Sequence, residues 1–280
     1  MNAQILDGKL VANKILDKIS NQVDIITASA LPVPKLVVLL IGDNNAAKLY
    51  VANKQKACRR VGIESELINL AANISEKELL DIIAKLNTNN AVTGILVQLP
   101  LPDHIDANKI ITAVNIKKDV DGFHPTNMGH LVQNNAVLSP CTPRGIMALL
   151  NHYRLDLQGL DAVIVGRSNI VGKPMALELI NAGCTVTVCN SHTKNLAKKV
   201  AQADLLVVAV GKANFIKGSW IKPGSIAIDV GINRIADTSL TGDIEYTEAI
   251  TRAAWITPVP GGVGPLTVAT LLSNTMVAYA

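Results

Sequence analysis

The fold class is decided at residues 162–174, which read Ala-Val-Ile-Val-Gly-Arg-Ser-Asn-Ile-Val-Gly-Lys-Pro. The four leading apolar residues predict a buried strand, and a helix is predicted over 171–182, after the glycine turn. Small residues at 166, 168 and 172 let the backbone approach a phosphate, and the helix start offers unpaired N–H groups. The spacing is not the usual G-x-G-x-x-G, so a tight turn that needs glycine only for packing is the alternative.

The next predicted strand, 185–189, ends without the acidic residue that usually binds the ribose 2′-hydroxyl of NAD. The residues that follow it are Asn190, Ser191, His192, Thr193 and Lys194. Hydroxyl and cationic groups at this point, together with Arg167, suit a 2′-phosphate and favour NADP over NAD. The alternative is that Ser191 and Thr193 only cap a helix that begins near Leu196.

Predicted strands and helices alternate along the chain, which indicates parallel β-α-β units and an α/β fold. The predicted strands are 35–41, 63–70, 94–97, 162–165, 185–189, 205–210 and 226–230. The predicted helices are 10–26, 45–61, 75–86, 142–152, 171–182, 196–203 and 265–279. Ser75 and Glu78 form a capping-box pattern, and Thr142 is expected to cap a helix that has Pro143 at its first position.

The length of 280 residues suits two domains, and the scarcity of aromatic residues, 3%, suits parallel sheets built from aliphatic side chains. We expect a Rossmann-like domain over 140–265. The other domain is expected over 1–139 plus 266–280, because the final helix can pack back on it.

Composition argues against several classes of protein. The net charge of +4 is modest, and basic residues are not interleaved with aromatic ones, which argues against a nucleic-acid partner. The four cysteines form no CxxC pair, as expected for a protein of a reducing, cytoplasmic compartment. No apolar run approaches the ~20 residues of a membrane helix, and the histidines show no metal-ligand spacing.

Candidate catalytic residues lie in the first half of the chain. Tyr50 and Lys54 are four residues apart and share one helix face. Gln98 follows a predicted strand, at the carboxyl side where α/β sites form. A Tyr-x-x-x-Lys pair also occurs in short-chain dehydrogenases, but there it follows the nucleotide motif, whereas here it precedes that motif.

Two loops add to these candidates. Asp119 and Asp121 lie in a polar turn, where each aspartate alone is more often structural. The glycine- and proline-rich run 258–265 predicts a rigid loop whose backbone can lie against a flat ligand.

In order along the chain, these strings resemble the bifunctional methylenetetrahydrofolate dehydrogenase/cyclohydrolase family. The matching strings are YVANK (50–54), VQLPLP (97–102), DVDG (119–122), PCTP (140–143), GRSNIVG (166–172), DVGIN (229–233) and PVPGGVGP (258–265). The resemblance covers essentially the whole chain. It implies two α/β domains that form a cleft, a homodimer, and NADP in the second domain.

The resemblance also implies roles for single residues. Lys54 would assist water addition and proton transfer with support from Gln98, Asp121 would hold the pterin ring, and Tyr50 would stack on the folate. Further folate contacts are expected at Leu99, Pro258, Gly261 and Gly262. Cofactor contacts are expected at Thr142, Gly166, Arg167, Ser168, Ile170, Ser191, Gly211 and Ile232.

The reactions implied are NADP-dependent oxidation of 5,10-methylenetetrahydrofolate to 5,10-methenyltetrahydrofolate, and hydrolysis of that product to 10-formyltetrahydrofolate. This is one-carbon chemistry of the kind used in purine biosynthesis. Two alternatives stay open: a monofunctional dehydrogenase in which Lys54 only positions the substrate, and a non-catalytic sensor of NADP or folate.

Overall fold

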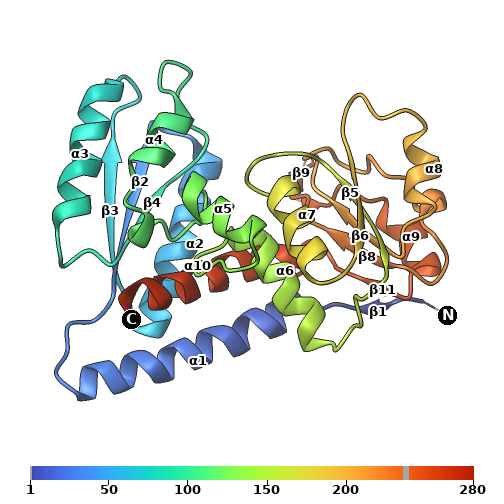
Figure 1. Ribbon diagram of the computed structural model, residues 1–280, viewed down its shortest axis with the longest axis horizontal. Coiled ribbons are helices and arrows are strands. Elements are labelled where there is room, and N and C mark those ends of the chain that lie inside the picture. Colours follow the sequence, from blue (N-terminus) through green and yellow to red (C-terminus); the bar gives the residue numbers. More distant parts are fainter. Residues whose placement is uncertain (1, 236–239) are drawn as a thin grey trace. The chain divides into compact units, whose positions relative to one another are not determined.

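The computed structural model describes residues 2–235 and 240–280 and divides into two compact units (Figure 1). The six-stranded unit comprises the chain up to Ala12 together with Thr142–Thr267. The three-stranded unit comprises Asn13–Cys141 and Val268–Ala280. Each unit has its own parallel sheet, so the predicted α/β fold class is confirmed.

In the three-stranded unit the strand order is β3 (Glu64–Leu70), β2 (Lys35–Ile41), β4 (Gly94–Val97), and both pairings are parallel. The central strand β2 is buried at every position after Lys35. A continuous apolar run of this kind is typical of a strand covered on both faces. The polar residues that follow β2 and β4 therefore emerge at one edge of this sheet.

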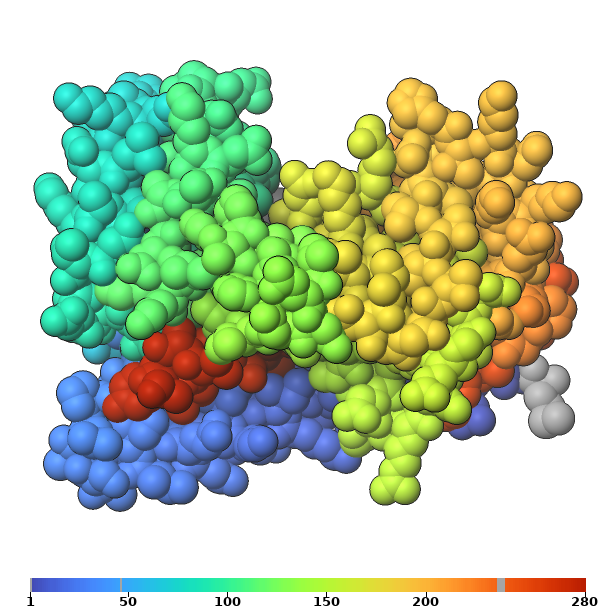
Figure 2. Space-filling view, in the orientation of Figure 1, coloured from blue at the N-terminus to red at the C-terminus, as the bar shows by residue number. Residues whose placement is uncertain are grey.

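The helices of this unit are α2 (Asn45–Val61), α3 (Glu76–Thr88), α4 (Ala107–Ala113), α5 (Pro125–Val132) and most of α1 (Gly8–Ala28) and α10 (Val263–Tyr279). The predicted capping box is confirmed, because Ser75 Oγ accepts the N–H of Glu78 while the Glu78 carboxylate accepts the N–H of Ser75. The C-terminal segment lies on α1 (Figure 2), and Tyr279 donates a 2.7 Å hydrogen bond to the Pro32 carbonyl.

The six-stranded unit has the strand order β1-β11-β8-β7-β5-β6, with parallel pairings throughout. Its strands are β1 (Gln4–Ile5), β5 (Asp161–Val165), β6 (Thr185–Cys189), β7 (Leu205–Val208), β8 (Ile226–Asp229) and β11 (Trp255–Ile256), and a separate pair is formed by β9 (Asn233–Arg234) and β10 (Leu240–Thr241). Its helices are α6 (Cys141–His152), α7 (Gly172–Asn181), α8 (Leu196–Val200) and α9 (Tyr246–Arg252). The chain leaves β5 toward β6 on one side and later returns to β7 on the other. Such a reversal marks the ligand-binding crevice of doubly wound sheets, outside the carboxyl ends of the strands.

Several predicted element ends differ in the structure, and three of the differences bear on predicted site residues or on the loops that carry them. Helix α6 begins at Cys141, so Thr142 lies within the first turn, and its hydroxyl contacts the Thr267 hydroxyl at 2.9 Å. Helix α8 ends at Val200, and its N-cap is Asn195, which adopts φ 55° and makes no side-chain cap bond. The capping alternative for Ser191 and Thr193 is therefore wrong.

The third correction concerns β7, which stops at Val208 rather than continuing to Val210. The reason is that the N–H of Val210 donates to the carboxylate of Asp243 and not to a neighbouring strand. No helix within residues 2–235 and 240–280 is long and apolar enough to cross a membrane.

Candidate active site and dinucleotide site

Lys54 and Gln98 meet in the three-stranded unit. Lys54 lies on α2, and its Nζ donates a 3.0 Å hydrogen bond to Oε1 of Gln98, the residue directly after β4. The Gln98 amide nitrogen donates at 2.8 Å to the Leu99 carbonyl, and this bond turns its oxygen toward the lysine. One turn before Lys54, Tyr50 is 41% exposed, which leaves its ring accessible for stacking.

The carboxylate of Asp121 belongs to the same group. Burial raises the pKa of Asp121 to about 6, and the negative charge of Asp119 acts in the same direction, whereas the Lys54 ammonium lowers it. Lys54 is therefore close enough to Asp121 for its positive charge to stabilise the ionised carboxylate. A cation, a half-buried carboxylate and an amide thus lie near one another at the carboxyl edge of the small sheet.

The loop that carries Asp121 is held from both sides by residues that the sequence analysis did not assign. The Asp119 carboxylate, 4% exposed, accepts from the Asn127 side chain and the His124 N–H, each at 2.8 Å. Asn274 on α10 donates at 2.8 Å to the Val120 carbonyl and at 2.9 Å to the Ser139 carbonyl. The Asp-x-Asp-Gly spacing could have indicated a structural role for Asp119. No local sequence pattern connects Asn274 to the loop at 119–122, because the two lie about 150 residues apart.

The predicted folate contacts Pro258, Gly261 and Gly262 belong to the six-stranded unit. A Cβ on Gly262 would lie 2.5 Å from the Pro258 carbonyl oxygen, and one on Gly8 would overlap the Gly262 carbonyl. The Gly261 carbonyl accepts the Lys9 N–H at 2.9 Å. The loop is thus closely packed, and its own packing already requires glycine at 262.

The turn after β5 has the strand–turn–helix form that its sequence predicts. Gly166 adopts φ +126°, and a Cβ there would overlap the Ala209 carbonyl. A Cβ on Gly172 would overlap the Gly166 carbonyl, so packing alone explains both glycines. The expectation of unpaired N–H groups is wrong for Val171 and Gly172, which donate to Ser168 Oγ at 3.1 and 3.3 Å. Ile170 beside them is 39% exposed.

Arg167 and Ser191 follow neighbouring strands. Val165 pairs with Cys189, and the Gly166 N–H donates at 2.9 Å to the Cys189 carbonyl. The segments that follow β5 and β6 therefore leave the sheet at the same level. Arg167 and Ser191 are exposed there. The turn that carries Ser191 is closed by Thr193 Oγ1, which accepts the Asn190 N–H at 2.8 Å. A guanidinium and a hydroxyl beside adjacent strand ends can bind a phosphate monoester.

The remaining predicted cofactor residues lie farther along the same sheet. Gly211 and Ile232 follow β7 and β8, and Ile232 is 41% exposed. The Gly211 N–H already donates to Asp243 at 2.9 Å, so a ligand can contact Gly211 only through its Cα or carbonyl group.

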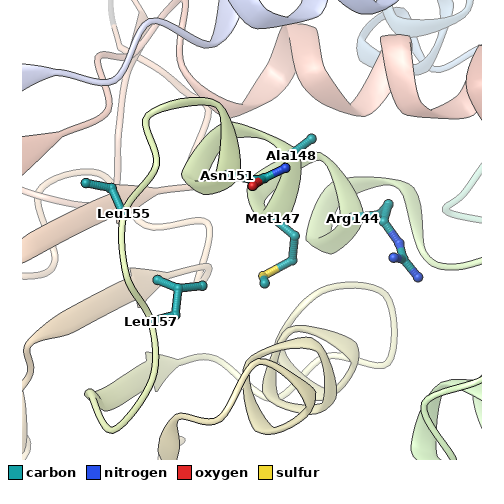
Figure 3. Close-up of a pocket in the computed structure, with 6 residues that line it drawn as sticks. All are labelled: Arg144, Met147, Ala148, Asn151, Leu155 and Leu157. Atoms are coloured by element: carbon teal, nitrogen blue, oxygen red, sulfur yellow. The ribbon is translucent and has the colours of Figure 1, made fainter.

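A pocket of about 410 Å³ in the six-stranded unit lies apart from these loops (Figure 3). It is lined by Arg144, Met147, Ala148, Asn151, Leu155 and Leu157, which come from α6 and from the segment that leads into β5. None of these residues is a predicted site residue. Among the residues that the structure describes, no cluster of three or more His, Cys, Asp or Glu could hold a metal ion.

Comparisons with known proteins cover both halves of the chain. Residues 6–121 match the model of the tetrahydrofolate dehydrogenase/cyclohydrolase catalytic domain, and residues 140–280 match that of its NAD(P)-binding domain. The bifunctional protein FolD 1 of Hydrogenovibrio crunogenus is 55% identical over 278 residues, which cover 99% of this chain and 98% of that protein.

Two solved structures are similar over nearly the full length. The FolD methylenetetrahydrofolate dehydrogenase/cyclohydrolase of Campylobacter jejuni is 46% identical, with a TM-score of 0.95 and coverage of 99% of both chains. The Trypanosoma brucei FolD, complexed with NADP and an inhibitor, is 36% identical, with a TM-score of 0.96 and coverage of 100% of this chain and 98% of that one. The predicted resemblance is confirmed: this chain belongs to the tetrahydrofolate dehydrogenase/cyclohydrolase family.

Proposed function

We propose that this protein oxidises 5,10-methylenetetrahydrofolate to 5,10-methenyltetrahydrofolate with NADP and hydrolyses the product to 10-formyltetrahydrofolate. The observation that carries the proposal is the 3.0 Å hydrogen bond between Lys54 Nζ and Gln98 Oε1, beside the half-buried carboxylate of Asp121. Family membership supports both activities.

In the oxidation step the protein mainly binds and orients the folate and NADP. When bound, NADP supplies the acceptor for the hydride. Tyr50 stacks on the folate and Asp121 accepts hydrogen bonds from the pterin ring, so the donor carbon is held in one orientation. Arg167 and Ser191 bind the 2′-phosphate, a role supported by their exposure beside the ends of β5 and β6.

The hydrolysis step needs a group that moves a proton as water adds to the methenyl carbon. Lys54 is that group, and its side-chain nitrogen moves the proton. Gln98 fixes the direction of the amine through the 3.0 Å hydrogen bond, and the Leu99 carbonyl holds the Gln98 amide in turn. The rotamer that places the amine is thus set before substrate binds.

The proposal includes the organisation of the protein. Residues 1–139 with 266–280 form the folate-binding catalytic domain, and 140–265 form the NADP-binding domain, except that the segment up to Ala12 packs with the six-stranded unit. The family matches to residues 6–121 and 140–280 support a boundary near residue 140. The protein acts as a homodimer, as the sequence resemblance implies, and in the cytoplasm, as its cysteines indicate, without a nucleic-acid partner. Its product serves one-carbon metabolism, including purine biosynthesis.

Replacement of Lys54 by Met tests the proposal and separates it from a monofunctional dehydrogenase. We expect methenyl hydrolysis to fall by about 10²-fold or more, because general acid–base catalysis contributes that much. NADP-dependent oxidation should continue, and methenyl absorbance should accumulate in the assay. Lys56→Met is the matched control, since Lys56 is exposed on the same helix.

Two results would contradict the proposal. Full hydrolase activity in Lys54→Met would remove Lys54 from that step, and no methenyl hydrolysis by the unmodified protein would favour the monofunctional dehydrogenase. No reduction of NADP or NAD by the unmodified protein with methylenetetrahydrofolate would favour the non-catalytic sensor.

A further inference from the structure

Two aspartates of the six-stranded unit are buried outside the residues assigned above. Asp229 is the last residue of β8 and is 4% exposed, and Asp243, between β10 and α9, is fully buried. Carboxylates are rarely buried in this way unless their oxygens receive hydrogen bonds. The donors around each one therefore indicate what it holds in place.

Asp243 collects four hydrogen bonds from two different loops. Its Oδ2 accepts the N–H groups of Val210 and Gly211 at 2.7 and 2.9 Å. Its Oδ1 accepts the N–H of Lys212 at 2.9 Å and the side-chain amide of Asn233 at 2.8 Å. Three consecutive backbone donors thus point at one carboxylate, which determines the path of residues 210–212 after β7.

Asp229 in turn holds the segment that carries Asp243. Asp229 Oδ1 accepts the N–H groups of Gly231 and Asp243, both at 2.9 Å, and its Oδ2 accepts the N–H of Ile244 at 2.8 Å. The N–H of Asp229 itself donates to Thr257 Oγ1 at 2.8 Å. The two carboxylates therefore link the end of β8 to the loop after β7, and the backbone N–H of Asp229 connects them to Thr257 after β11.

Two glycines make this arrangement sterically possible. A Cβ on Gly231 would overlap the Asp243 carboxylate, and a Cβ on Gly242 would overlap the Asp229 carboxylate. The Asp-Val-Gly-Ile-Asn string at 229–233 and the Gly242-Asp243 pair thus pack against each other, and each places a glycine beside the carboxylate of the other.

The loops held by Asp243 lie where a parallel sheet binds its ligand. They follow β7 and β8 at the carboxyl edge and contain Gly211 and Ile232, both predicted cofactor contacts. Ligand binding is strongest when the contacting backbone is already in its bound conformation. Asp243 has no free oxygen to offer a ligand, so its influence must pass through these loops.

We propose that Asp243 is a positioning residue for the dinucleotide site, which holds the 210–212 and 231–233 loops in the conformation that binds NADP. This inference rests on the proposed function of the six-stranded unit as the cofactor-binding part. In this role Asp243 contacts neither NADP nor the folate substrate and takes no part in methenyl hydrolysis.

Replacement of Asp243 by Asn tests the inference at nearly constant side-chain size. The new NH₂ group faces backbone N–H donors in place of an acceptor, so at least one of them loses its partner. We expect the Kd and KM for NADP to rise by about tenfold or more. Methenyl hydrolysis should keep its kcat/KM within about twofold, because it consumes no NADP.

Hydrogen exchange supplies a second readout. The amides of residues 210–212 should exchange faster in Asp243→Asn without NADP, while peptides from β2 and β4 keep their protection. Burial raises the pKa of Asp229 to about 6, so measurements at a pH of about 8 keep that neighbour ionised. Asp161→Asn, an exposed aspartate at the start of β5, is the matched control.

If Asp243→Asn does not fold, Asn233→Ala removes only one of the four donors. It should weaken NADP binding several-fold and leave methenyl hydrolysis unchanged. The inference is overturned if NADP affinity stays within twofold in these variants, or if hydrolysis and NADP binding fall in parallel, as for general destabilisation. No NADP binding by the unmodified protein in equilibrium dialysis would overturn the proposed function, and this inference with it.

Discussion

Asp119 and Asp121 stand two residues apart, yet their surroundings give them different roles. The oxygens of Asp119 are occupied by the N–H groups of Phe123 and His124 from its own loop and by the side-chain amide of Asn127 on α5 at 2.8 Å. The Asp121 carboxylate contacts the Cys141 thiol at 3.9 Å and retains capacity to accept hydrogen bonds from a ligand. Asp119 is thus structural, whereas Asp121 is suited to the pterin.

Asp121 should give substrate binding a pH dependence. With a pKa of about 6, it is ionised above pH 6 and protonated below it, at a higher pH than an ordinary aspartate. Because the ionised form is the better acceptor, we expect the KM for the methenyl substrate to rise as pH falls from about 7.5 to about 5, by up to about tenfold.

Steady-state hydrolysis kinetics across this range check the prediction. Asp121→Asn should show a high KM at every pH, and the exposed Asp161→Asn should follow the unmodified protein. A KM that does not change with pH in the unmodified protein would exclude Asp121 as the group responsible.

At the scale of secondary structure, the strength of the local signal decided which elements were predicted. The strand β2, with its six-residue apolar run at 36–41, and the capping box of α3 were both predicted correctly. The helices α4 and α9, of seven residues each, were not predicted, because two turns are too short for a clear helical period.

The capping box yields a prediction about stability. Ser75→Ala removes the side-chain acceptor for the Glu78 N–H, and we expect the free energy of unfolding to fall by about 0.5–2 kcal/mol. Urea denaturation measures the change. Ser29→Ala, which removes an exposed hydroxyl bonded to the Ile25 carbonyl at the end of α1, should change stability by less than about 0.5 kcal/mol. An equal loss in both variants would contradict a specific role for the cap.

At the scale of the whole molecule, chemistry is divided between two sheets. The three-stranded unit carries Lys54, Gln98 and Asp121, and the six-stranded unit carries the Arg167 turn and the loops held by Asp243. Each sheet presents its polar residues beyond the carboxyl ends of its strands, as parallel sheets commonly do.

NADP should therefore stabilise the six-stranded unit directly. At 100 times its Kd, NADP is expected to add about 2.7 kcal/mol to the free energy of unfolding, and NAD at the same concentration should add less. Scanning calorimetry with each nucleotide measures the difference. Arg167→Ala should abolish the preference for NADP, whereas the exposed Arg59→Ala should retain it; equal stabilisation by both nucleotides in the unmodified protein would contradict the 2′-phosphate assignment.

The sequence by itself determined the α/β class, most strand positions, the turn at 166–172 and the missing acid after β6, because each depends on residues close together in the chain. Only the tertiary structure decided that Ser168 pairs the first N–H groups of α7, that Thr142 meets Thr267, and that β7 ends early. It also decided that Asn274 holds the Asp121 loop and that Asp243 holds the loop after β7. Hydrogen bonds of this kind join groups far apart in sequence, and only the packing of strands and helices brings donor and acceptor within reach.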